Sequence, residues 1–506
     1  MENETTAESS TLKQEALKPE PVKRETLMWA LLLGVLGDML LREGVIGPGL
    51  ALWVGLAGCA ATGLAWRVDK TQLRSVAGWS AVALVAAGMM VLRDSPSLRF
   101  LLFLLLPVAL SHIVMLSWGA RLGRSLPVDH LYGLLSVPAR ALIGGAPLLD
   151  SLRMRRGRVV PRLMGIGRGL ILALPLLWIF SGLLSSADAA FNRFADQAFD
   201  WFTVSDLTSH VVIALVLAWV VSGWLKAVLD RGHENLFLRL PLPRIGRDET
   251  LIVLGSLALL FGGFVVLQLS YLFGGYEAIQ GVSGLTVANY ARRGFFELVV
   301  IAGLTLGVLL VARAVTSSQR LYQWLALVLV GLVLVMLISA VQRFVLYIDA
   351  FGLSLDRLTV LAILLWLALT LVIFATTVLR GQFSWFASGS TLAGIAVVLL
   401  LALMNPAAWV ARVNMDRAID HQQSLDTDYL VSLGADAVPT VLDRLDQLPQ
   451  ADRCTLAAEL LWRWHTMIVT QPDWRVWNRA QAKAVDGVAE RHDFLRAASE
   501  GCAVNR

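Results

Sequence analysis

The chain is a succession of long apolar stretches separated by short polar connections. A helix needs about 20 apolar residues to cross a hydrocarbon core of about 30 Å, and its backbone groups must be hydrogen-bonded within the segment. Eleven stretches fit this description: 26–41, 45–66, 76–92, 100–119, 169–184, 211–229, 251–274, 295–312, 321–348, 358–379 and 391–404. The first, third and last are short, so ten or twelve spans fit the pattern as well. The pattern predicts an all-α, polytopic transmembrane helix bundle with about 11 spans.

Composition supports this prediction. Of the 506 residues, 57% are hydrophobic and only 16% are charged, whereas soluble domains carry about 25% charged residues. Residues 1–25 are polar and have no apolar core, so we expect a disordered cytoplasmic tail and not a cleavable signal peptide. Residues 26–404 then form the transmembrane domain.

The distribution of Lys and Arg predicts the orientation, because positively charged loops stay in the cytoplasm. With the N-terminus inside, the inner segments collect 24 Lys and Arg and the outer loops 8. Nine of the 24 lie between Arg121 and Arg168. We therefore expect a multi-pass protein of a bacterial inner membrane with its N-terminus in the cytoplasm.

An odd number of spans places residues 405–506 outside, as a small helical domain. This tail has 11 Lys and Arg against 14 Asp and Glu, and a slightly acidic tail agrees with translocation. Its apolar spacing is helical, with a predicted stop at Gly434 and Asp436 as the N-cap of the next helix.

The three cysteines fall in different settings. Cys59 lies in the second predicted span beside Gly55 and Gly63, a spacing of small residues typical of close helix packing. Cys454 and Cys502 both lie in the predicted external domain, where an oxidising compartment permits a disulfide between them.

Motifs of known chemistry are absent from the sequence. It contains no GxxxxGKS phosphate loop, HExxH, CxxC or GxSxG, and its seven His are scattered, so we expect no metal site and no cofactor. No basic segment belongs to a soluble fold that could present it to nucleic acid. We lean against an enzyme.

A polar cluster marks the start of the eighth predicted span, in the stretch ANYARRGFFE at 288–297. In the predicted topology it faces outside, as does the end of the ninth span. If the two helices pack as neighbours, Glu297 meets Arg343 at the same depth. The candidate polar site comprises Tyr290, Arg292, Arg293, Glu297, Gln342 and Arg343, together with Asp38 and Asp188 on the same side. It is either a structural clasp between two helices or the lining of a cavity that binds a polar or anionic group.

Further polar residues collect on the same side. Asp38 lies near the outer end of the first span, Asp188 just beyond the fifth, and His210 before the sixth. Each is more often a cap or an interfacial contact than a ligand. For His112, deeper in the fourth span, we favour an interhelical hydrogen bond over a proton relay.

On the inner side, Arg153, Arg155, Arg156 and Arg158 either bind anionic lipids, at about 1 kcal/mol per basic residue, or only fix the topology.

Several segments resemble those of a known family. They are GRGLILALPLLWIFSGLLSSADAAF (167–191), GLTVANYARRGFFELV (284–299), NPAAWVARVNMDRAI (405–419), DTDYLVSLGADAVPTVLDRL (426–445) and DWRVWNRAQA (473–482). The chain resembles bacterial membrane proteins grouped as domain of unknown function 4173, and the related 4153 group. The resemblance covers most of the chain after the N-terminal tail and implies a polytopic membrane protein without an assigned activity or catalytic residue. Val287 stands where the resemblance implies a polar residue such as Glu, so a site there has one carboxylate fewer, or a shifted one.

The sequence leaves several functions open. We favour binding or transport of a small or amphipathic solute, or envelope sensing through the external domain. Pro107 and Pro175 interrupt two adjacent spans, which slightly favours transport. The alternatives are a membrane-embedded enzyme at the outer leaflet, with Glu297 as its acid or base, and a scaffold for partner proteins.

Overall fold

The structure is a computed structural model that describes residues 20–68, 70–118, 127–143, 206–229, 244–272, 295–421, 423–469 and 473–500, together with isolated positions between 180 and 191. Up to Met404 its helices are α2 (Glu20–Leu41), α3 (Pro48–Val68), α4 (Leu73–Leu92), α5 (Pro96–Ser117), α6 (Pro127–Ile143), α10 (Asp206–Leu229), α11 (Arg247–Leu272), α14 (Phe295–Val315), α15 (Gln319–Phe351), α16 (Leu355–Thr377) and α17 (Phe383–Met404). Among the described residues there is no strand, only a β-bridge between Ile245 and Thr316. The predicted all-α class is confirmed.

Nine helices in the described part of the chain are long and apolar enough to cross a membrane. They coincide with nine of the predicted spans: Pro48–Arg67, Leu73–Leu92, Pro96–Ser117, Ser209–Leu229, Arg247–Gln268, Glu297–Val315, Gln319–Asp349, Leu355–Thr377 and Phe383–Met404. The first predicted span falls in α2, which begins at Glu20 and is not among the nine. The fifth predicted span, 169–184, lies outside the described residues apart from two positions.

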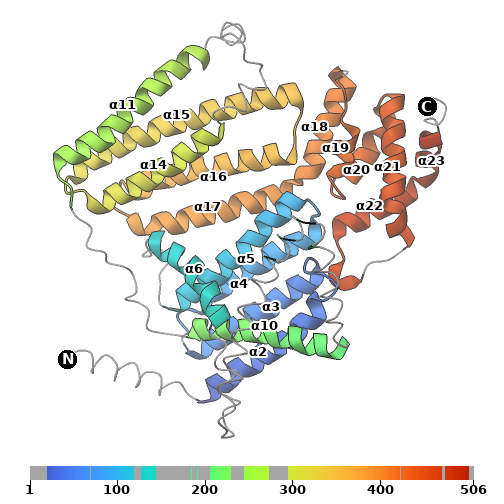
Figure 1. Ribbon diagram of the computed structural model, residues 1–506, viewed down its shortest axis with the longest axis horizontal. Helices are drawn as coiled ribbons and strands as arrows, with labels where there is room; N and C mark the ends of the chain where they lie inside the picture. Colours follow the sequence, from blue (N-terminus) through green and yellow to red (C-terminus); the bar gives the residue numbers. More distant parts are fainter. Residues whose placement is uncertain are drawn as a thin grey trace.

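The helices pack around two hydrophobic cores. The first core joins α2, α3, α4, α5, α6 and α10 to part of α17 and to the C-terminal helices. The second joins α11, α14, α15 and α16. Helix α17 packs against both α16 and α5 and so connects the two groups. Figure 1 shows the second group above the first, with most helix axes running in similar directions.

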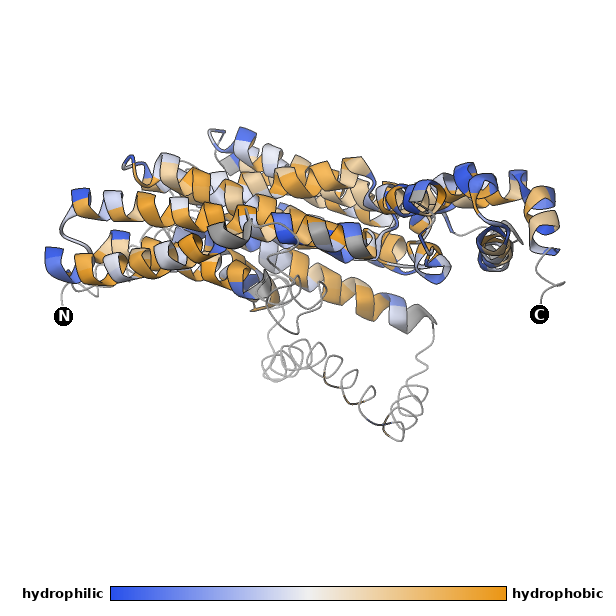
Figure 2. Cartoon of the chain, turned by 90° about the horizontal axis from the view of Figure 1, so that it is seen from above, coloured by the Kyte–Doolittle hydropathy of each residue, from blue (hydrophilic) through white to orange (hydrophobic). Residues whose placement is uncertain are grey.

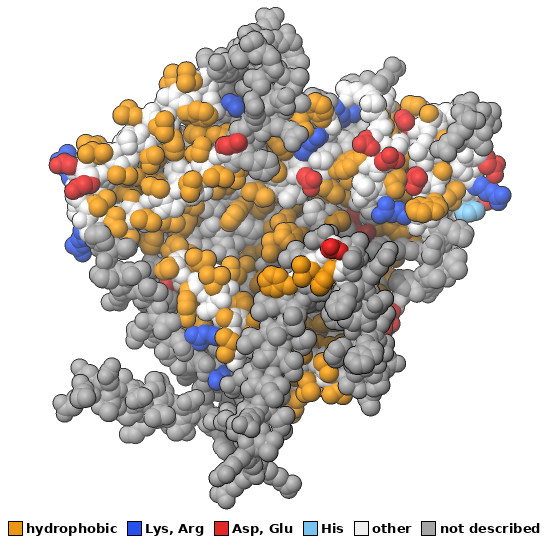
Figure 3. Space-filling view, in the orientation of Figure 1, with side chains coloured by type: hydrophobic (Ala, Val, Ile, Leu, Met, Phe, Trp, Pro, Cys, Tyr) orange, Lys and Arg blue, Asp and Glu red, His pale blue; other side chains and the backbone are white. Residues whose placement is uncertain are grey.

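The outer surface of the bundle is apolar. On α11, Leu259 is 80% exposed and Ile252 is 68% exposed. Figure 2 shows hydrophobic residues along the helices and hydrophilic ones near their ends. In Figure 3, which has the orientation of Figure 1, hydrophobic side chains cover much of the visible surface of the bundle. Large exposed apolar surfaces of this kind fit a bundle surrounded by lipid.

The tail from Pro406 onward is helical. Its elements are α18 (Pro406–His421), α19 (Thr427–Ser432), α20 (Val438–Arg444), η1 (Leu445–Gln447), α21 (Gln450–Val469), η2 (Trp474–Val476), α22 (Arg479–Glu490) and α23 (His492–Glu500). It starts after Asn405, whose φ of 53° breaks the helix that α17 would otherwise continue. Helix α19 ends at Ser432 with Leu433 as its C-cap, and Gly434 follows with φ 81°, so the predicted stop at this glycine is confirmed. Figure 1 places these helices at the end of the bundle opposite to the beginning of α2.

Asp436 joins this tail to the connection between α4 and α5. Its Oδ2 accepts hydrogen bonds from the backbone N–H groups of Asp94 (2.5 Å) and Ser95 (3.1 Å), and its Oδ1 lies 3.6 Å from Arg93 Nη1. Both N–H groups precede α5, so Asp436 binds the connection between α4 and α5, whereas α20 has Ala437 as its N-cap residue. The prediction that Asp436 caps the next tail helix is wrong, because this connection, distant in sequence, supplies the N–H groups.

Asn478 makes a second joint of the same kind. Its Oδ1 accepts from the N–H groups of Ala480 (2.9 Å) and Gln481 (3.2 Å) and so caps α22. Its Nδ2 donates to the carbonyl oxygens of Met90 and Arg93, both at 3.0 Å, at the end of α4. One buried amide thus satisfies the backbone of two helices.

Arg475 makes the third joint, at the connection between α2 and α3. Its Nη1 donates to Met39 O at 2.7 Å, and its Nη2 lies 3.2 Å from Glu43 Oε1. Its hydrogen bonds to Asp473 lower the pKa of that carboxyl to about 2. A Cβ on Gly47 would lie 2.3 Å from Arg475 O, so only glycine permits this close approach.

Two predictions about the spans are corrected. Cys59 is exposed, and Gly58 makes the close contact instead, since a Cβ there would lie 2.9 Å from the Ser80 side chain. Pro107 lies inside α5, which runs without a break from Pro96 to Ser117.

Candidate functional site

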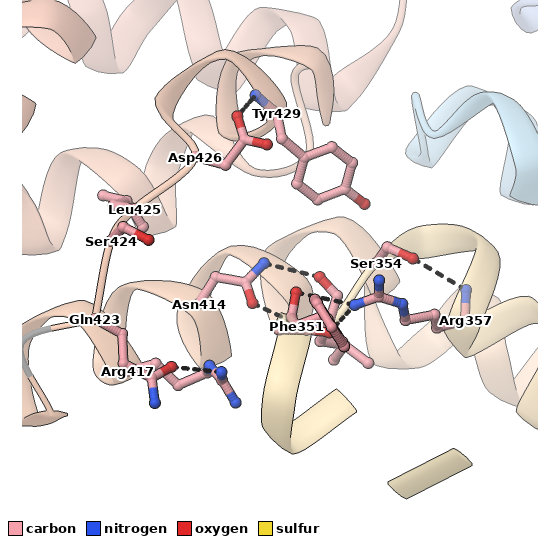
Figure 4. A pocket seen from close by; sticks show the side chains of 12 residues that line it. Phe351, Ser354, Arg357, Asn414, Arg417, Gln423, Ser424, Leu425, Asp426 and Tyr429 are labelled. Atoms are coloured by element: carbon pink, nitrogen blue, oxygen red, sulfur yellow. Dashed lines mark hydrogen bonds between the residues drawn. The ribbon is translucent and has the colours of Figure 1, made fainter. Parts of the chain in front are cut away.

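A polar pocket of about 610 Å³ lies where the α15–α16 connection meets α18 and α19. We call it the junction pocket (Figure 4). It lies at helix ends, on the side of the bundle that carries the tail. It is lined by Phe351, Gly352, Leu353, Ser354, Arg357, Asn414, Arg417, Gln423, Ser424, Leu425, Asp426 and Tyr429.

The α15–α16 connection supplies one wall. Gly352 has φ 79° and ends α15, and the Ser354 hydroxyl accepts from Arg357 N at 3.2 Å to begin α16. The Arg357 guanidinium folds back over this turn. It donates to the carbonyl oxygens of Phe351 (3.0 Å) and Gly352, and lies 4.4 Å from the ring centre of Tyr347. The turn thus fixes a cation at the rim of the pocket.

Helix α18 supplies the facing wall through two residues spaced three apart. Asn414 accepts from Leu353 N at 2.9 Å and donates to Leu353 O at 2.8 Å. Arg417 donates to Ile348 O at 3.1 Å and to Gln423 Oε1 at 2.5 Å. These bonds hold a second guanidinium in the pocket by anchoring it to the last turn of α15.

Tyr429 closes the pocket from α19. Its hydroxyl accepts a hydrogen bond from Leu355 N at 2.8 Å, and Asp426 accepts from Tyr429 N at 2.9 Å as the cap of α19. Burial raises the pKa of Tyr429, so its O–H is a neutral group at physiological pH. The pocket therefore combines two arginines and the Asp426 carboxylate with amide and hydroxyl groups. The arginines outnumber the carboxylate, so the lining has a net positive charge that suits an anionic group.

The polar cluster predicted from the sequence is only partly described. Tyr290, Arg292 and Arg293 lie outside the described residues. Gln342 is exposed on α15, one turn or more from the junction pocket. The assignment of these residues to a site stays a prediction.

Glu297 and Arg343 are not ion-paired with each other in the described part of the chain, and Glu297 is exposed. Helices α14 and α15 are antiparallel, and Tyr322 donates to Leu309 O at 2.9 Å. Glu297 is twelve residues before Leu309 on α14, and Leu334 is twelve residues after Tyr322 on α15, so these two residues lie at about the same level. Arg343 is then about 14 Å of helical rise beyond Glu297. Among the described residues, no polar group lies within hydrogen-bonding reach of Glu297, as a catalytic acid or base would need.

Asp38 and His210, predicted on the same side from separate spans, are brought into contact. His210 Nδ1 hydrogen-bonds Asp38 Oδ2, and Arg42 Nη1 lies 3.2 Å from Asp38 Oδ1. Arg42 also donates to Ser209 Oγ at 2.5 Å. Asp38 is buried and His210 is partly exposed. The group joins α2 to α10 near the tail.

Two further sequence candidates, Asp188 and His112, are hydrogen-bonded. Asp188 Oδ1 accepts from Phe191 N at 3.1 Å, as a cap does. His112 Nε2 lies 2.9 Å from Nδ1 of His130 on α6, so the predicted interhelical hydrogen bond is confirmed. Within the described residues, no group of three or more His, Cys, Asp and Glu could hold a metal ion.

Two predictions fall on positions that are not described. Cys454 is buried in α21, with its Sγ 3.7 Å from Ser499 O, but Cys502 lies outside the described residues. Cys454 is disulfide-bonded, whereas its pairing with Cys502 stays a prediction. The same holds for anionic-lipid binding at the arginines between 153 and 158, which also lie outside them.

Sequence reasoning missed the junction pocket, although a signal was present. Asn414 and Arg417 lie in the segment NPAAWVARVNMDRAI, and Asp426 and Tyr429 in DTDYLVSLG. Both segments carry the family resemblance. Polar residues there could have been considered as site residues together with the end of the ninth span.

No curated protein and no solved structure matches this chain. The sequence model of a domain of unknown function, DUF4153, matches residues 80–444. The match runs from α4 through the bundle to the end of α20 and includes every residue that lines the junction pocket. It does not confirm the resemblance to the 4173 group. Because the match spans well over half of the chain, the protein belongs to the DUF4153 family of unknown function.

Proposed function

We propose that the protein binds a small anionic or amphipathic solute in the junction pocket. The observation that carries this proposal is the pair of anchored guanidinium groups, Arg357 and Arg417, in a pocket of about 610 Å³. Ligand pockets usually have volumes of about 300–1,000 Å³. Arginine presents several donors in a planar fork, which suits carboxylate or phosphate groups.

The position of the pocket favours sensing over transport. It lies at the ends of α15 and α16, whereas transporter sites lie near the middle of the bilayer. Seven of its twelve lining residues come from α18, α19 and the segment between them. A bound solute would therefore contact the membrane helices and the tail together, so binding would stabilise their docking.

We further propose a bacterial inner membrane, with the N-terminus in the cytoplasm and the tail outside. Support comes from basic residues at the end of the bundle where α2 begins, since such residues favour the cytoplasm. They are Arg67, Lys70, Arg74, Arg244, Arg247, Arg313, Arg320 and Arg380. Membership of the 4173 group is part of the same proposal. In a Cys59→Ala background, a membrane-impermeant maleimide should label Asp428→Cys but not Ser317→Cys in intact cells; the reverse pattern contradicts the orientation.

Binding can be tested with octyl phosphate, an anionic amphiphile, and the purified full-length protein in neutral detergent. Octyl phosphate should raise the melting temperature more than octyl glucoside does. Ser424 is exposed at the pocket wall, so Ser424→Trp should fill the pocket and abolish the shift without removing a contact.

Arginine variants give the second arm of the test. Arg417→Gln should weaken octyl phosphate binding about tenfold or more, because a charge-assisted hydrogen bond contributes about 1.5–3 kcal/mol. Arg412 lies on the same helix and is exposed, so Arg412→Gln serves as the matched control. Equal shifts in the wild type, Ser424→Trp and Arg417→Gln would refute the proposal.

A further inference from the structure

Helix α6 differs from the spanning helices. It has 17 residues and was expected to be part of an inner loop. Asp129, Gly133, Val137 and Ala141 form its buried stripe, four residues apart. In Figure 1 it crosses the direction of α5 and α10 near the end of α10. This is the geometry of a helix that lies in the plane of the membrane surface.

The outward side of α6 is apolar. Leu131 is 57% exposed, Leu135 67% and Ile143 65%. An interfacial helix buries such residues among the upper parts of acyl chains. Lipid chains beside α6 would bring their head groups to its polar edge.

A cavity of about 340 Å³ opens at that edge, between α6 and α10. We call it the α6–α10 cavity. Its lining is Ser136, Ala139, Arg140, Ile143, Gly223, Lys226 and Ala227. It thus contains two cations from the last turns of two helices.

Close helix contacts fix the shape of this cavity. A Cβ on Gly223 would lie 2.3 Å from Ala141 O, so α6 touches the α10 backbone directly. Trp219 Nε1 donates to Leu142 O at 2.7 Å, and Trp118 Nε1 donates to Ala227 O at 2.8 Å. The walls are therefore held before any ligand arrives.

The polar groups of the cavity are arranged for an anion. The Arg140 guanidinium lies 4.6 Å from the Trp118 ring centre and donates to the Tyr132 hydroxyl at 3.3 Å. Ser136 Oγ is buried and has no hydrogen-bond partner among the described residues. The helix dipole also stabilises cations near helix C-termini, which is an alternative explanation for the two cations. That explanation accounts neither for the cavity nor for a buried donor without an acceptor.

We infer that the α6–α10 cavity binds the phosphate of an acidic phospholipid, with its acyl chains along Leu131, Leu135 and Ile143. Arg140 and Lys226 supply the charge and Ser136 donates to a phosphate oxygen. This site lies at the opposite end of the bundle from the junction pocket and does not depend on the function proposed for that pocket.

The test uses purified full-length protein in neutral detergent and native mass spectrometry. Phosphatidylglycerol, phosphatidylcholine and inorganic phosphate are titrated separately. We expect phosphatidylglycerol to bind more tightly than phosphatidylcholine and to be displaced little by inorganic phosphate. Lys226→Gln should weaken phosphatidylglycerol binding about 5-fold. Ala139 is an exposed lining residue, so Ala139→Phe should fill the cavity and abolish this binding while the fold persists.

Arg74 provides the matched control, because it is an exposed cation at the same end of the bundle, in the first turn of α4. Arg74→Gln should bind phosphatidylglycerol like the wild type. The inference is overturned if Lys226→Gln and Ala139→Phe bind like the wild type, if Arg74→Gln loses as much affinity as Lys226→Gln, or if phosphatidylcholine binds equally well. Inorganic phosphate that binds as tightly as the lipid would overturn the assignment to a phospholipid.

Discussion

Replacing Asn478 tests how strongly the tail is joined to the bundle. The side chain is 3% exposed and makes two bonds as acceptor within α22 and two as donor to the end of α4. Asn478→Ala removes both sets. Asn478→Asp keeps an acceptor for the α22 N–H groups but points carboxylate oxygens at the carbonyls of Met90 and Arg93.

The magnitude follows from the bonds. Loss of an N-cap costs about 1 kcal/mol, and each of the two lost bonds to α4 about 1 kcal/mol. Asn478→Ala should therefore lower the free energy of unfolding by about 3 kcal/mol. Asn478→Asp should destabilise the α4 joint at least as much while leaving the α22 cap in place.

Hydrogen exchange measured by mass spectrometry separates the two effects. In Asn478→Ala, exchange should accelerate at the end of α4 and the start of α22, and in Asn478→Asp mainly at the end of α4. Asp426 caps α19 without a bond to the bundle, so Asp426→Ala should cost only about 1 kcal/mol. If Asn478→Asp is as stable as the wild type, the donor bonds to α4 contribute nothing and the reasoning fails.

Three more predictions concern single groups. Asp38→Asn should destabilise the protein by about 1–2 kcal/mol. This is less than for a fully buried ion pair, because its partner His210 is partly exposed. Thermal unfolding that matches the wild type would contradict this prediction. Burial raises the pKa of Asp436, so its contribution to stability is full below about pH 4 and is lost as the pH rises through its folded-state pKa. In Asp436→Asn the side-chain amide oxygen can still accept from the backbone N–H groups, but the group no longer titrates. The melting temperature of this variant should therefore rise relative to that of the wild type as the pH rises above about 4, and a difference that does not change with pH argues against this. Gly434→Ala should cost about 1–2 kcal/mol because of its φ of 81°, and more than Gly381→Ala, which has the same φ but no atom within 4 Å; equal unfolding free energies would exclude a contribution from packing.

Hydropathy predicted the spanning helices well because a helix that crosses lipid must be long and apolar, whichever helices it packs against. It placed some ends wrongly. The last span was predicted to start at 391, whereas α17 starts at Phe383. The serines between these positions lowered the hydropathy, so the first part of the helix was not predicted. One of them, Ser390, hydrogen-bonds Thr370 of α16 at 2.9 Å. Helix α6 was missed because it is short and contains Pro138 and Arg140.

The candidate site was harder to predict because it depends on which helices pack together and at what register. The sequence put Asp38 and His210 at the same side, but only the packing of α2 on α10 joins residues 172 positions apart. It paired Glu297 with Arg343 from their places at span ends, and the longer α15 separates them. The junction pocket combines the end of one helix with two helices of the tail, and no local pattern indicates such a contact.

The joint at Arg475 constrains how the protein is made. The Met39 carbonyl accepts from a guanidinium that is translated 436 residues later, long after α2 has left the ribosome. Until then the Met39 carbonyl lacks this donor. A chain that stops short of Arg475 therefore leaves this end of α2 uncovered even when every spanning helix has been inserted.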